Sequence, residues 1–367
     1  MSTRSCPAGP DGVRVMVVLN ERTPRTAVDV YRALERLKAE GGLDASVVYP
    51  YLSRLDELRD RTLVVEDLIR SVTEFRPSIL LWVHAHDLGI SAKVSDMLRR
   101  ASGGCAIGFW EADWYDWFQK PFPRQTLGLL KSSDTVFVCG EGAFSGWLKR
   151  SGCRDVRYVP STGDGRFVEH LVPRVFDFDV VMIGSKVRSR VPFRTMGGAV
   201  ERSKLVEAFT RQYGARFAVF GHGWAGPSAQ GPVPFEQQAD ICGRAACVLG
   251  NNHLYARYYF SNRLPIAMQA GRPVVHARVE GYEEVFGRDS GVRWFTTIEE
   301  ALEKAQGVVS NPSCTAADAE EARVLAESRF TTFHALSYMI RVLSSKRSAQ
   351  TSAEGIVANP WIDRERL

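Results

Sequence analysis

Two histidines in the first half of the chain are spaced so that their side chains could act together. His84 and His86 follow an apolar run and lie two residues apart, so on a strand end both point to one face. Asp87 follows directly. We predict His84 and His86 as catalytic residues and Asp87 as an acceptor-binding residue. Two alternatives stay open: a metal site, which would need a third ligand, and histidines that are only packed.

A second cluster combines acids with flat aromatic side chains at the end of another apolar run. Its members are Trp110, Glu111, Asp113, Trp114 and Trp117. Aromatic faces of this kind stack on sugar rings, and a carboxylate can accept a proton from a hydroxyl group. We therefore predict Asp113 as a general base and Glu111 and Trp114 as acceptor-binding residues. The alternative is a helix N-cap beside packed tryptophans.

Glycines and basic residues in the second half could bind phosphate groups. Gly184 and Ser185 follow an apolar run, so free backbone N–H groups there could meet a diphosphate. The basic side chains that follow are Lys186, Arg188, Arg190 and Arg194. Gly221 and Gly223 would let the backbone approach a ligand closely, and Trp224 could lie against a base or ribose. The alternatives are a solvated basic loop and a packed tryptophan.

Two polar triplets could supply further donors to phosphates or sugar hydroxyls. They are Asn251, Asn252 and His253, which close a strand, and Ser261, Asn262 and Arg263, which open a helix. Arg263 is the strongest of these, because a guanidinium group can bridge two phosphate oxygens. The alternative for Arg263 is a surface residue at the start of a helix.

Short β-rich apolar runs alternate with longer amphipathic stretches throughout, which predicts βα units and parallel sheets. The predicted strands are 13–19, 46–49, 79–83, 106–110, 135–139 and 156–159 in the first half, and 179–183, 216–220, 246–249, 273–276 and 292–295 in the second. The stretch 55–75 has a helical pattern.

The fold class predicted from this alternation is α/β, with two tandem Rossmann-like domains. The predicted parts are a disordered N-terminus at 1–12, a first Rossmann-like domain at 13–165, a linker at 166–177, a second Rossmann-like domain at 178–330, and a C-terminal helix and tail at 331–367. Parallel sheets bind ligands at the carboxyl ends of their strands, so the active site is expected in a cleft between the domains.

The composition is that of an ordinary globular protein. The 367 residues are 45% hydrophobic and 24% charged, and the formal charge of +5 is compatible with phosphate-bearing ligands without requiring nucleic acid. The seven cysteines lack the paired spacing of zinc or redox sites, so we expect reduced thiols. No apolar run is long enough for a membrane span and no secretory signal is present, which predicts a cytoplasmic protein.

Four segments, taken in order, resemble a known enzyme family. They read SDTVFVCGEGAFSGWLKRSGCRDVRYVPSTGD at 133–164, FDVVMIGS at 178–185, RFAVFGHGW at 216–224 and SNRLPIAMQAGRPVVHARVEGYEEVF at 261–286. They are similar to the group 1 glycosyltransferases, and most closely to the spore-maturation-type branch. The resemblance implies the GT-B fold, a nucleotide-sugar donor held mainly by the second domain, and an acceptor held mainly by the first. A UDP-sugar is the expected donor, with GDP- and dTDP-sugars as alternatives.

The chain departs from that family's pattern at one important position. In the retaining members an acid normally stands where this chain has Ile266, and that acid usually holds the donor ribose. Glu280 is available as a substitute acid and is predicted as a donor-binding residue. The departure leaves open whether the anomeric configuration is retained or inverted.

These observations predict a metal-independent glycosyltransferase without a cofactor, acting on a hydroxyl group of a small molecule, glycan or natural product. Helix N-termini and Arg or Lys side chains would stabilise the leaving diphosphate. Two alternatives remain: a nucleic-acid base as acceptor, and an inactive binding or scaffolding module. A dinucleotide-dependent oxidoreductase is disfavoured because residues 20–26 contain no glycine, and a hydrolase because 142–146 does not form a Gly-x-Ser-x-Gly elbow.

Overall fold

The computed structural model describes most of the chain, and the described residues form two compact units. They are residues 12–85, 91–115, 122–123, 126–163, 176–186, 196–348 and 357–362. Unit 1 holds the described residues from 12 to 115, from 122 to 159 and from 332 to 360. Unit 2 holds those from 160 to 331 together with 361 and 362. Most of the predicted linker, 166–177, lies outside the described residues.

Unit 1 is built on a six-stranded parallel sheet with the order β2-β1-β3-β4-β5-β6. Its strands are β1 (Arg14–Leu19), β2 (Ala45–Pro50), β3 (Ile79–Val83), β4 (Ala106–Glu111), β5 (Thr135–Val138) and β6 (Val156–Tyr158). In β1, β3, β4 and β5 nearly every residue is buried, as expected for a sheet covered on both faces. All six strands predicted for the first half of the chain are confirmed.

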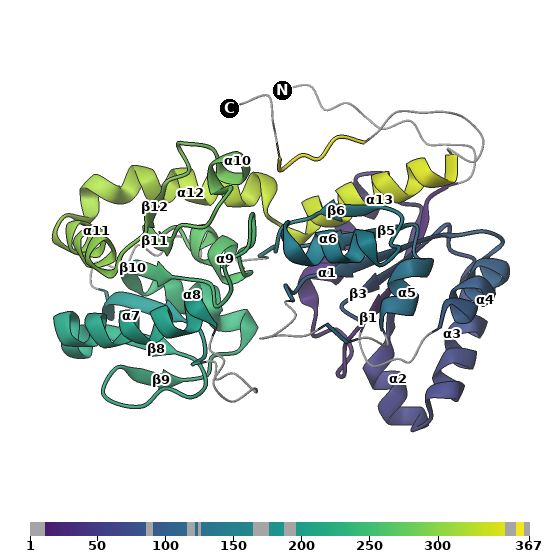
Figure 1. The fold of residues 1–367 in the computed structure, drawn as a ribbon, viewed down its shortest axis with the longest axis horizontal. Helices are drawn as coiled ribbons and strands as arrows, with labels where there is room; N and C mark the ends of the chain where they lie inside the picture. The colour runs from purple at the N-terminus through teal and green to yellow at the C-terminus, as the bar shows by residue number, and fades with distance from the viewer. Residues whose placement is uncertain are drawn as a thin grey trace. The chain divides into compact units, whose positions relative to one another are not determined.

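The helices of unit 1 connect these strands as crossovers (Figure 1). They are α1 (Val28–Ala39), α2 (Tyr51–Leu58), α3 (Arg61–Phe75), α4 (Ala92–Ser102), α5 (Leu127–Ser132) and α6 (Ala143–Arg150). A helical pattern was predicted over 55–75, and the structure divides this stretch between α2 and α3. Arg59 is left-handed with a φ of 53°, and the Asp60 side chain accepts a hydrogen bond from the Thr62 N–H at 2.6 Å, so one helix ends and another begins there.

The last long helix, α13 (Thr332–Ser348), belongs to unit 1 although unit 2 precedes it in the chain. It packs on α1, β3 and β4 and is drawn in yellow in Figure 1. Gly108 on β4 makes room for it, since a Cβ there would overlap the Leu343 side chain. The Thr332 hydroxyl donates to the Asp29 carboxylate at 2.7 Å and so attaches the start of α13 to α1.

Unit 2 contains a second six-stranded parallel sheet, with the order β12-β11-β10-β7-β8-β9. Its strands are β7 (Phe178–Ile183), β8 (Phe217–Phe220), β9 (Ala229–Gly231), β10 (Ala245–Gly250), β11 (Val274–Ala277) and β12 (Val292–Phe295). The five strands predicted for the second half are confirmed. The short edge strand β9 was not predicted, because its three residues carry no apolar signal.

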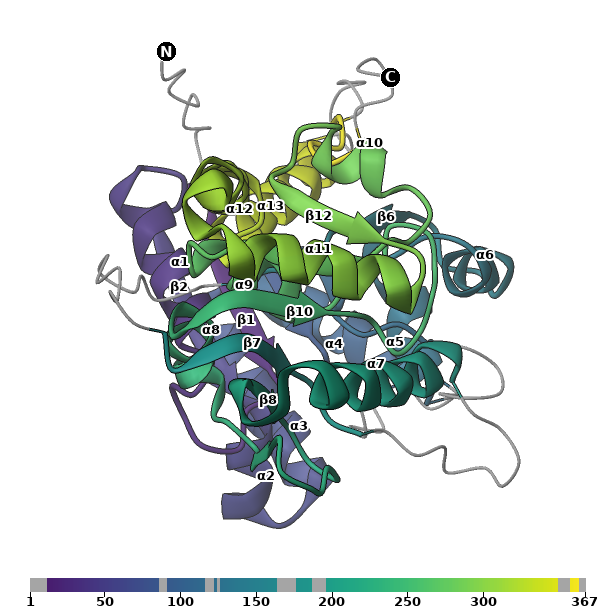
Figure 2. The ribbon, with the colours of Figure 1, turned by 90° about the vertical axis from the view of Figure 1, so that its left-hand side faces the viewer.

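Helices flank the sheet of unit 2. They are α7 (Gly197–Tyr213), α8 (Gln238–Gly243), α9 (Arg263–Gln269), α10 (Tyr282–Phe286), α11 (Ile298–Ser310) and α12 (Ala316–Arg329), with 3-10 turns at Gly214–Arg216, Phe235–Gln237 and Pro312–Thr315. Figure 2 shows α7 and α11 in front of the strands, and their apolar residues form one buried core with β7, β8, β10 and β11. Within the described ranges, no helix is long and apolar enough to cross a membrane.

Candidate functional sites

The loops that follow β7 and β8 lie at the carboxyl edge of the unit 2 sheet and pack directly on each other. The Gly184 N–H donates to the Phe220 carbonyl at 2.7 Å, so this group is engaged within the sheet rather than free for a ligand. A Cβ at position 221 would lie 2.6 Å from the Gly184 carbonyl oxygen, and φ of Gly221 is +145°. Gly184 and Gly221 therefore allow two backbones to approach, which is an architectural role.

Trp224 and Ser185 stabilise the same pair of loops. The Trp224 indole donates from Nε1 to the Gly184 carbonyl at 2.6 Å and packs against the core of unit 2. Lys186 lies over its ring, with Nζ 5.6 Å from the ring centroid. The Ser185 hydroxyl oxygen accepts from the His222 N–H at 3.2 Å. The structure thus shows Trp224 as a packed residue, with Gly223 in the turn before it at a φ of +82°.

A buried arginine lies next to these loops. Arg202 is 1% exposed, although it stands in the middle of α7. Its guanidinium donates from Nε to Asn251 Oδ1 at 2.7 Å, from Nη2 to the Asn251 carbonyl at 2.8 Å and from Nη1 to the Ser185 carbonyl at 3.1 Å. Among the residues that the structure describes, no carboxylate forms an ion pair with it. Burial, and then repulsion from Arg263, lowers its pKa to about 9.

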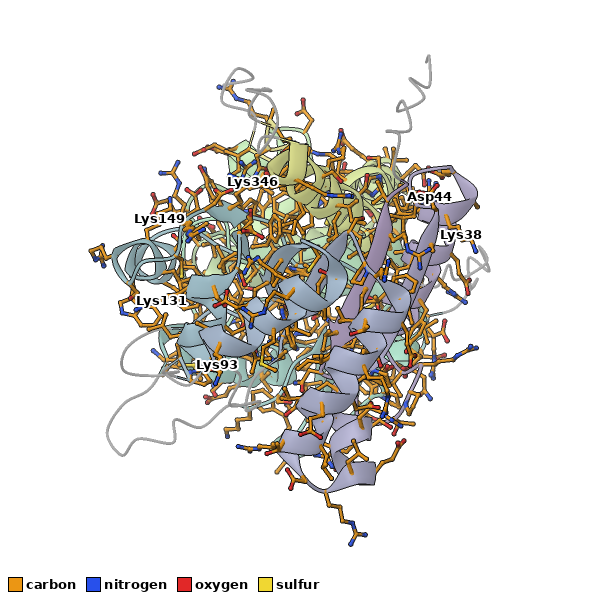
Figure 3. All side chains as sticks on the ribbon, turned by 90° about the vertical axis from the view of Figure 1, so that its right-hand side faces the viewer. Lys38, Asp44, Lys93, Lys131, Lys149 and Lys346 are labelled. Atoms are coloured by element: carbon orange, nitrogen blue, oxygen red, sulfur yellow. The ribbon has the colours of Figure 1, made fainter. Side chains whose placement is uncertain are left out.

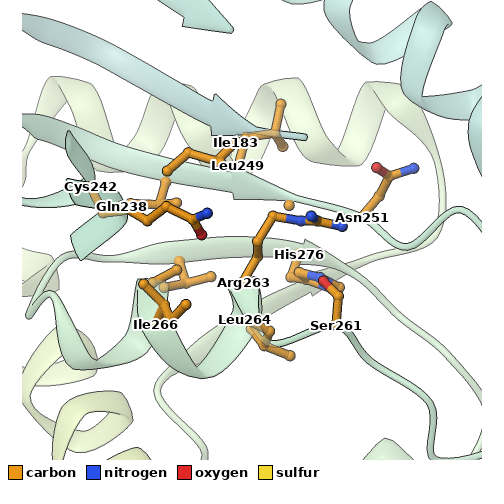
Figure 4. Close-up of a pocket in the computed structure, with 14 residues that line it drawn as sticks. Ile183, Gln238, Cys242, Leu249, Asn251, Ser261, Arg263, Leu264, Ile266 and His276 are labelled. Atoms are coloured by element: carbon orange, nitrogen blue, oxygen red, sulfur yellow. The ribbon is translucent and has the colours of Figure 1, made fainter. Parts of the chain in front are cut away.

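Arg263 extends from the first position of α9 into a pocket at the same edge of the sheet (Figure 4). The polar or charged residues that line this pocket include Gln238, Asn251, Ser261, Arg263 and His276. Its apolar lining includes Ile183 at the end of β7 and Ile266 on α9. Asn251, Ser261 and Arg263 were all predicted as donor-binding residues, and the structure brings these three together.

His276 on β11 contributes a neutral imidazole to this pocket. The ring is buried, and Nδ1 lies 2.8 Å from the Ala277 carbonyl, which favours a proton on Nδ1. Gly250 makes room for the ring, because a Cβ there would lie 3.1 Å from Nε2 and would overlap the ring carbon beside it. Burial, together with a smaller repulsion from Arg202 and Arg263, lowers the pKa of His276 to about 4.

This depressed pKa makes unit 2 less stable in acid. His276 takes up a proton below about pH 6.5 in the unfolded chain but only near pH 4 in the folded protein. The neutral, buried imidazole therefore costs no stability above pH 6.5, and the free energy of unfolding decreases as the pH falls from 6.5 towards 4. We expect roughly 2–3 kcal/mol less stability at pH 4.5 than at pH 7.5 from this residue. Urea unfolding of His276→Gln should show a smaller acid loss than the unchanged protein. Equal losses in the two proteins would show that His276 is not the cause.

The other predicted polar residues organise the loop between β10 and α9. The Asn251 amide donates to the Gly198 carbonyl at 2.8 Å and so attaches this loop to the first turn of α7. The Asn252 amide donates to the Tyr259 carbonyl at 3.0 Å and to the Tyr282 hydroxyl at 2.8 Å. Asn252 therefore stabilises the conformation of this loop through buried hydrogen bonds. His253 follows it, half-buried, and Asn262 immediately precedes Arg263.

Glu280 is not part of this pocket. Its side chain is 77% exposed, and Oε1 lies 3.8 Å from Nη1 of Arg257. Ile266 is buried and lines the pocket, and Gly163 lies so close that a Cβ there would be 2.9 Å from the Ile266 backbone nitrogen. The structure therefore does not bring Glu280 to the position that Ile266 leaves without an acid, because the loop after β11 carries Glu280 out to the surface.

In unit 1, the ends of β3 and β4 hold a histidine against a buried carboxylate. His84 Nδ1 lies 2.7 Å from Glu111 Oε1, and the same oxygen accepts from the Asp113 N–H at 3.0 Å. The Glu111 side chain is fully buried, whereas that of His84 is 34% exposed. His84 is left-handed with a φ of 47°, a strained conformation for a residue with a side chain. Its N–H still donates to the Trp110 carbonyl at 2.9 Å.

The remaining predicted residues of unit 1 have more varied positions. Asp113 is half-buried, and its backbone N–H donates the hydrogen bond to Glu111 described above. Trp114 is buried and packs edge to face on Phe144, with ring centroids 5.4 Å apart. Six of the residues singled out from the sequence lie outside the described residues: His86, Asp87, Trp117, Arg188, Arg190 and Arg194.

Sequence reasoning missed Arg202 and the pairing of His84 with Glu111. A signal for Arg202 was present, because it lies on the stripe of α7 formed by Gly198, Leu205, Val206 and Phe209, which are all buried. A charged residue on the apolar face of a helix is rarely buried unless its charge is bound by a specific partner. The pairing in unit 1 had no local signal, since the two residues are 27 positions apart.

Comparisons with known proteins bear on both units. A family model described as glycosyl transferase-like matches residues 194–341, which is less than half of the chain. HepE from Anabaena, solved with UDP and glucose, is similar in structure with a TM-score of 0.55 and 15% identity over 91% of this chain and 100% of that one. Sucrose-phosphate synthase from Thermosynechococcus elongatus gives 0.57 and 11% over 92% and 100%.

Trehalose 6-phosphate synthase from Burkholderia multivorans gives a TM-score of 0.56 and 10% identity over 93% of this chain and 100% of that one. The chain has the GT-B fold. This confirms the predicted fold class of two tandem Rossmann-like domains. A search of curated proteins found no match to the sequence. At identities this low, the GT-B likeness establishes architecture, and function has to be argued from the residues of the two sites.

Proposed function

We propose that this GT-B protein is a glycosyltransferase that moves a sugar from a nucleotide-diphosphate sugar to a hydroxyl-bearing acceptor. The observation that carries the proposal is Arg202, a buried guanidinium without an ion-paired carboxylate among the described residues, close enough to Arg263 for the two to repel. Buried charge without a counter-ion is costly. A diphosphate bound beside Arg202 and Arg263 would neutralise them both.

The same arrangement supports the departure of a diphosphate leaving group. Negative charge grows on the diphosphate oxygen as the bond to the sugar breaks, and guanidinium groups already in place stabilise it without rearrangement. The amino end of α7, one turn before Arg202, adds a partial positive charge. We therefore propose a metal-independent reaction. In the described part of the chain, no cluster of three His, Cys, Asp or Glu side chains could hold a metal.

We propose UDP as the nucleotide, because HepE was solved with UDP and with UDP-glucose and shares the fold. GDP and dTDP remain alternatives. The closer relation to the spore-maturation-type branch and the cytoplasmic location remain predictions from the sequence.

The acceptor is proposed to be a small molecule or glycan. A nucleic-acid acceptor would be favoured by a strong basic stripe on unit 1. Figure 3 labels Lys93, Lys131, Lys149 and Lys346 among the side chains of this unit. Lys346 lies 3.2 Å from the Asp155 carboxylate, so part of this charge is neutralised. The mixed charge favours the smaller acceptors.

Nucleotide binding tests the proposal most directly. We expect UDP, or one other nucleoside diphosphate, to raise the melting temperature, since a hundredfold excess over Kd adds about 2.7 kcal/mol of stability. For a unit of this size that is roughly 5–10 °C. The screen compares UDP, GDP, dTDP and CDP, with NAD as a control of another class. No shift with any nucleotide would contradict the proposal and favour a scaffolding role, to which the missing acid at Ile266 also points.

A further inference from the structure

An amide oxygen in the pocket that Arg263 enters is buried without a hydrogen-bond donor. Gln238, the first residue of α8, lines this pocket, and its amide end points into it (Figure 4). Among the residues that the structure describes, none donates to Gln238 Oε1, although this oxygen is buried. A buried acceptor without a donor is costly, so we expect this oxygen to receive a hydrogen bond from a bound molecule.

Two other polar side chains of this pocket are already engaged within unit 2. The Asn251 amide accepts from Arg202 at 2.7 Å and donates to a carbonyl of α7 at 2.8 Å. His276 Nδ1 lies 2.8 Å from the carbonyl of the next residue. No Asp or Glu is among the described residues that line the pocket. Gln238 Oε1 is therefore the acceptor that a ligand can use, and beside Arg263 its donor is a neutral group such as a hydroxyl rather than a cation.

The positions on α9 indicate which part of a nucleotide would meet this oxygen. Arg263 and Ile266 lie three positions apart and so on one face of α9, with about 5–6 Å between their Cβ atoms. α8 packs on α9, and Gln238 and Ile266 line the same pocket. In a nucleoside diphosphate whose phosphates are bound by Arg263, the group one helical turn away is the ribose. Its hydroxyls are the neutral donors that Gln238 Oε1 lacks.

We propose that Gln238 recognises the ribose of the donor nucleotide, and that its amide oxygen accepts a hydrogen bond from a ribose hydroxyl. This inference rests on the proposed function. It explains how the pocket can hold a ribose although Ile266 stands where an acid was expected, because a neutral amide on the neighbouring helix presents the acceptor instead. Glu280, the substitute expected from the sequence, is 77% exposed and does not line the pocket.

Nucleotides that lack one hydroxyl test this contact by isothermal titration. The unchanged protein should bind 2′-deoxy-UDP or 3′-deoxy-UDP about 5- to 20-fold more weakly than UDP, because that analogue leaves the buried oxygen without a donor. In Gln238→Met this preference for UDP should disappear, since both partners of the hydrogen bond are then absent or irrelevant. Methionine keeps most of the volume and removes a buried acceptor without a partner, so Gln238→Met should be at least as stable as the unchanged protein.

The possible results separate this inference from the proposed function. Equal binding of UDP and both analogues by the unchanged protein, or a preference that persists in Gln238→Met, would overturn the inference and leave the proposed function intact. If Gln238→Met weakens all three nucleotides equally, the amide binds the base rather than the ribose, which also overturns it. If GDP or dTDP binds instead of UDP, that nucleotide and its forms lacking a sugar hydroxyl replace the UDP series. No binding of any of the three nucleotides contradicts the proposed function itself.

Two further variants provide the controls. Gln237 is the adjacent glutamine, is exposed and does not line the pocket, so Gln237→Met should keep the preference for UDP. Gln238→Glu retains an acceptor for a hydroxyl but loses the amide N–H donors, and it should keep the preference as well. Loss of the preference in Gln237→Met would indicate a change in α8 rather than a contact, and loss in Gln238→Glu would indicate that the amide donates. Either result would contradict the assignment.

Discussion

Replacing Arg202 by methionine is expected to lower the affinity for UDP by about 100-fold or more, since hydrogen bonds to charged groups contribute about 1.5–3 kcal/mol each. The free energy of unfolding should change by less than about 2 kcal/mol. Methionine fills most of the volume and removes a buried charge that has no ion-paired carboxylate among the described residues. The substitution also removes the donor to the carbonyls of Ser185 and Asn251, which lowers stability and offsets part of that gain. Isothermal titration with UDP and urea unfolding measure the two quantities.

Arg272 provides the matched control for this variant. It is a half-buried arginine of unit 2 that donates from Nε to the Gly243 carbonyl at 2.9 Å, and burial lowers its pKa as well. It lies two residues before β11 begins, whereas the pocket lies at the carboxyl ends of the strands. Arg272→Met should bind UDP as the unchanged protein does. If Arg202→Met also binds UDP normally, the buried guanidinium is not the phosphate site, and the proposed function loses its main support.

Gly198→Ala should destabilise unit 2 by about 3 kcal/mol and weaken UDP binding with it, because overpacking of a backbone contact cannot relax cheaply. A Cβ at position 198 would overlap the Asn252 carbonyl oxygen and lie 2.8 Å from the His253 carbonyl carbon. The first turn of α7 would have to move away from the loop after β10. Arg202 stands one turn later on α7 and is bonded to Asn251 of that loop, so the guanidinium would move as well.

The neighbouring glycine separates this steric effect from a general effect of alanine. Gly197 precedes Gly198 on the same helix, and a Cβ there would have no atom within 4 Å. Gly197→Ala should leave stability unchanged or raise it by up to about 1 kcal/mol, since alanine favours the helix. Thermal unfolding with and without UDP distinguishes the two variants. Equal stability in both would mean that α7 can shift without affecting the loop.

The sequence alone was enough to predict the two Rossmann-like units. It also predicted most of the polar residues at the carboxyl edge of the unit 2 sheet, where the pocket lies. Apolar runs such as 79–83 and 106–110 became β3 and β4, because the hydrophobic pattern of a buried parallel strand is local. Polar residues that directly follow such runs must lie at the carboxyl edge of a parallel sheet. This reasoning correctly placed Asn251 and Arg263 in one pocket.

Only the tertiary structure decided which of these residues act together. His84 meets Glu111 because β3 and β4 are neighbours in register, and Arg202 bonds to Asn251 because the buried face of α7 packs beside the loop after β10. Strand order, register and helix rotation are not encoded in local periodicity. The same holds for α13, which returns across 303 positions to donate from Thr332 to Asp29, and for Glu280, which the loop after β11 carries to the surface. Contacts between residues far apart in sequence follow from the packing of whole elements, and only the folded chain shows them.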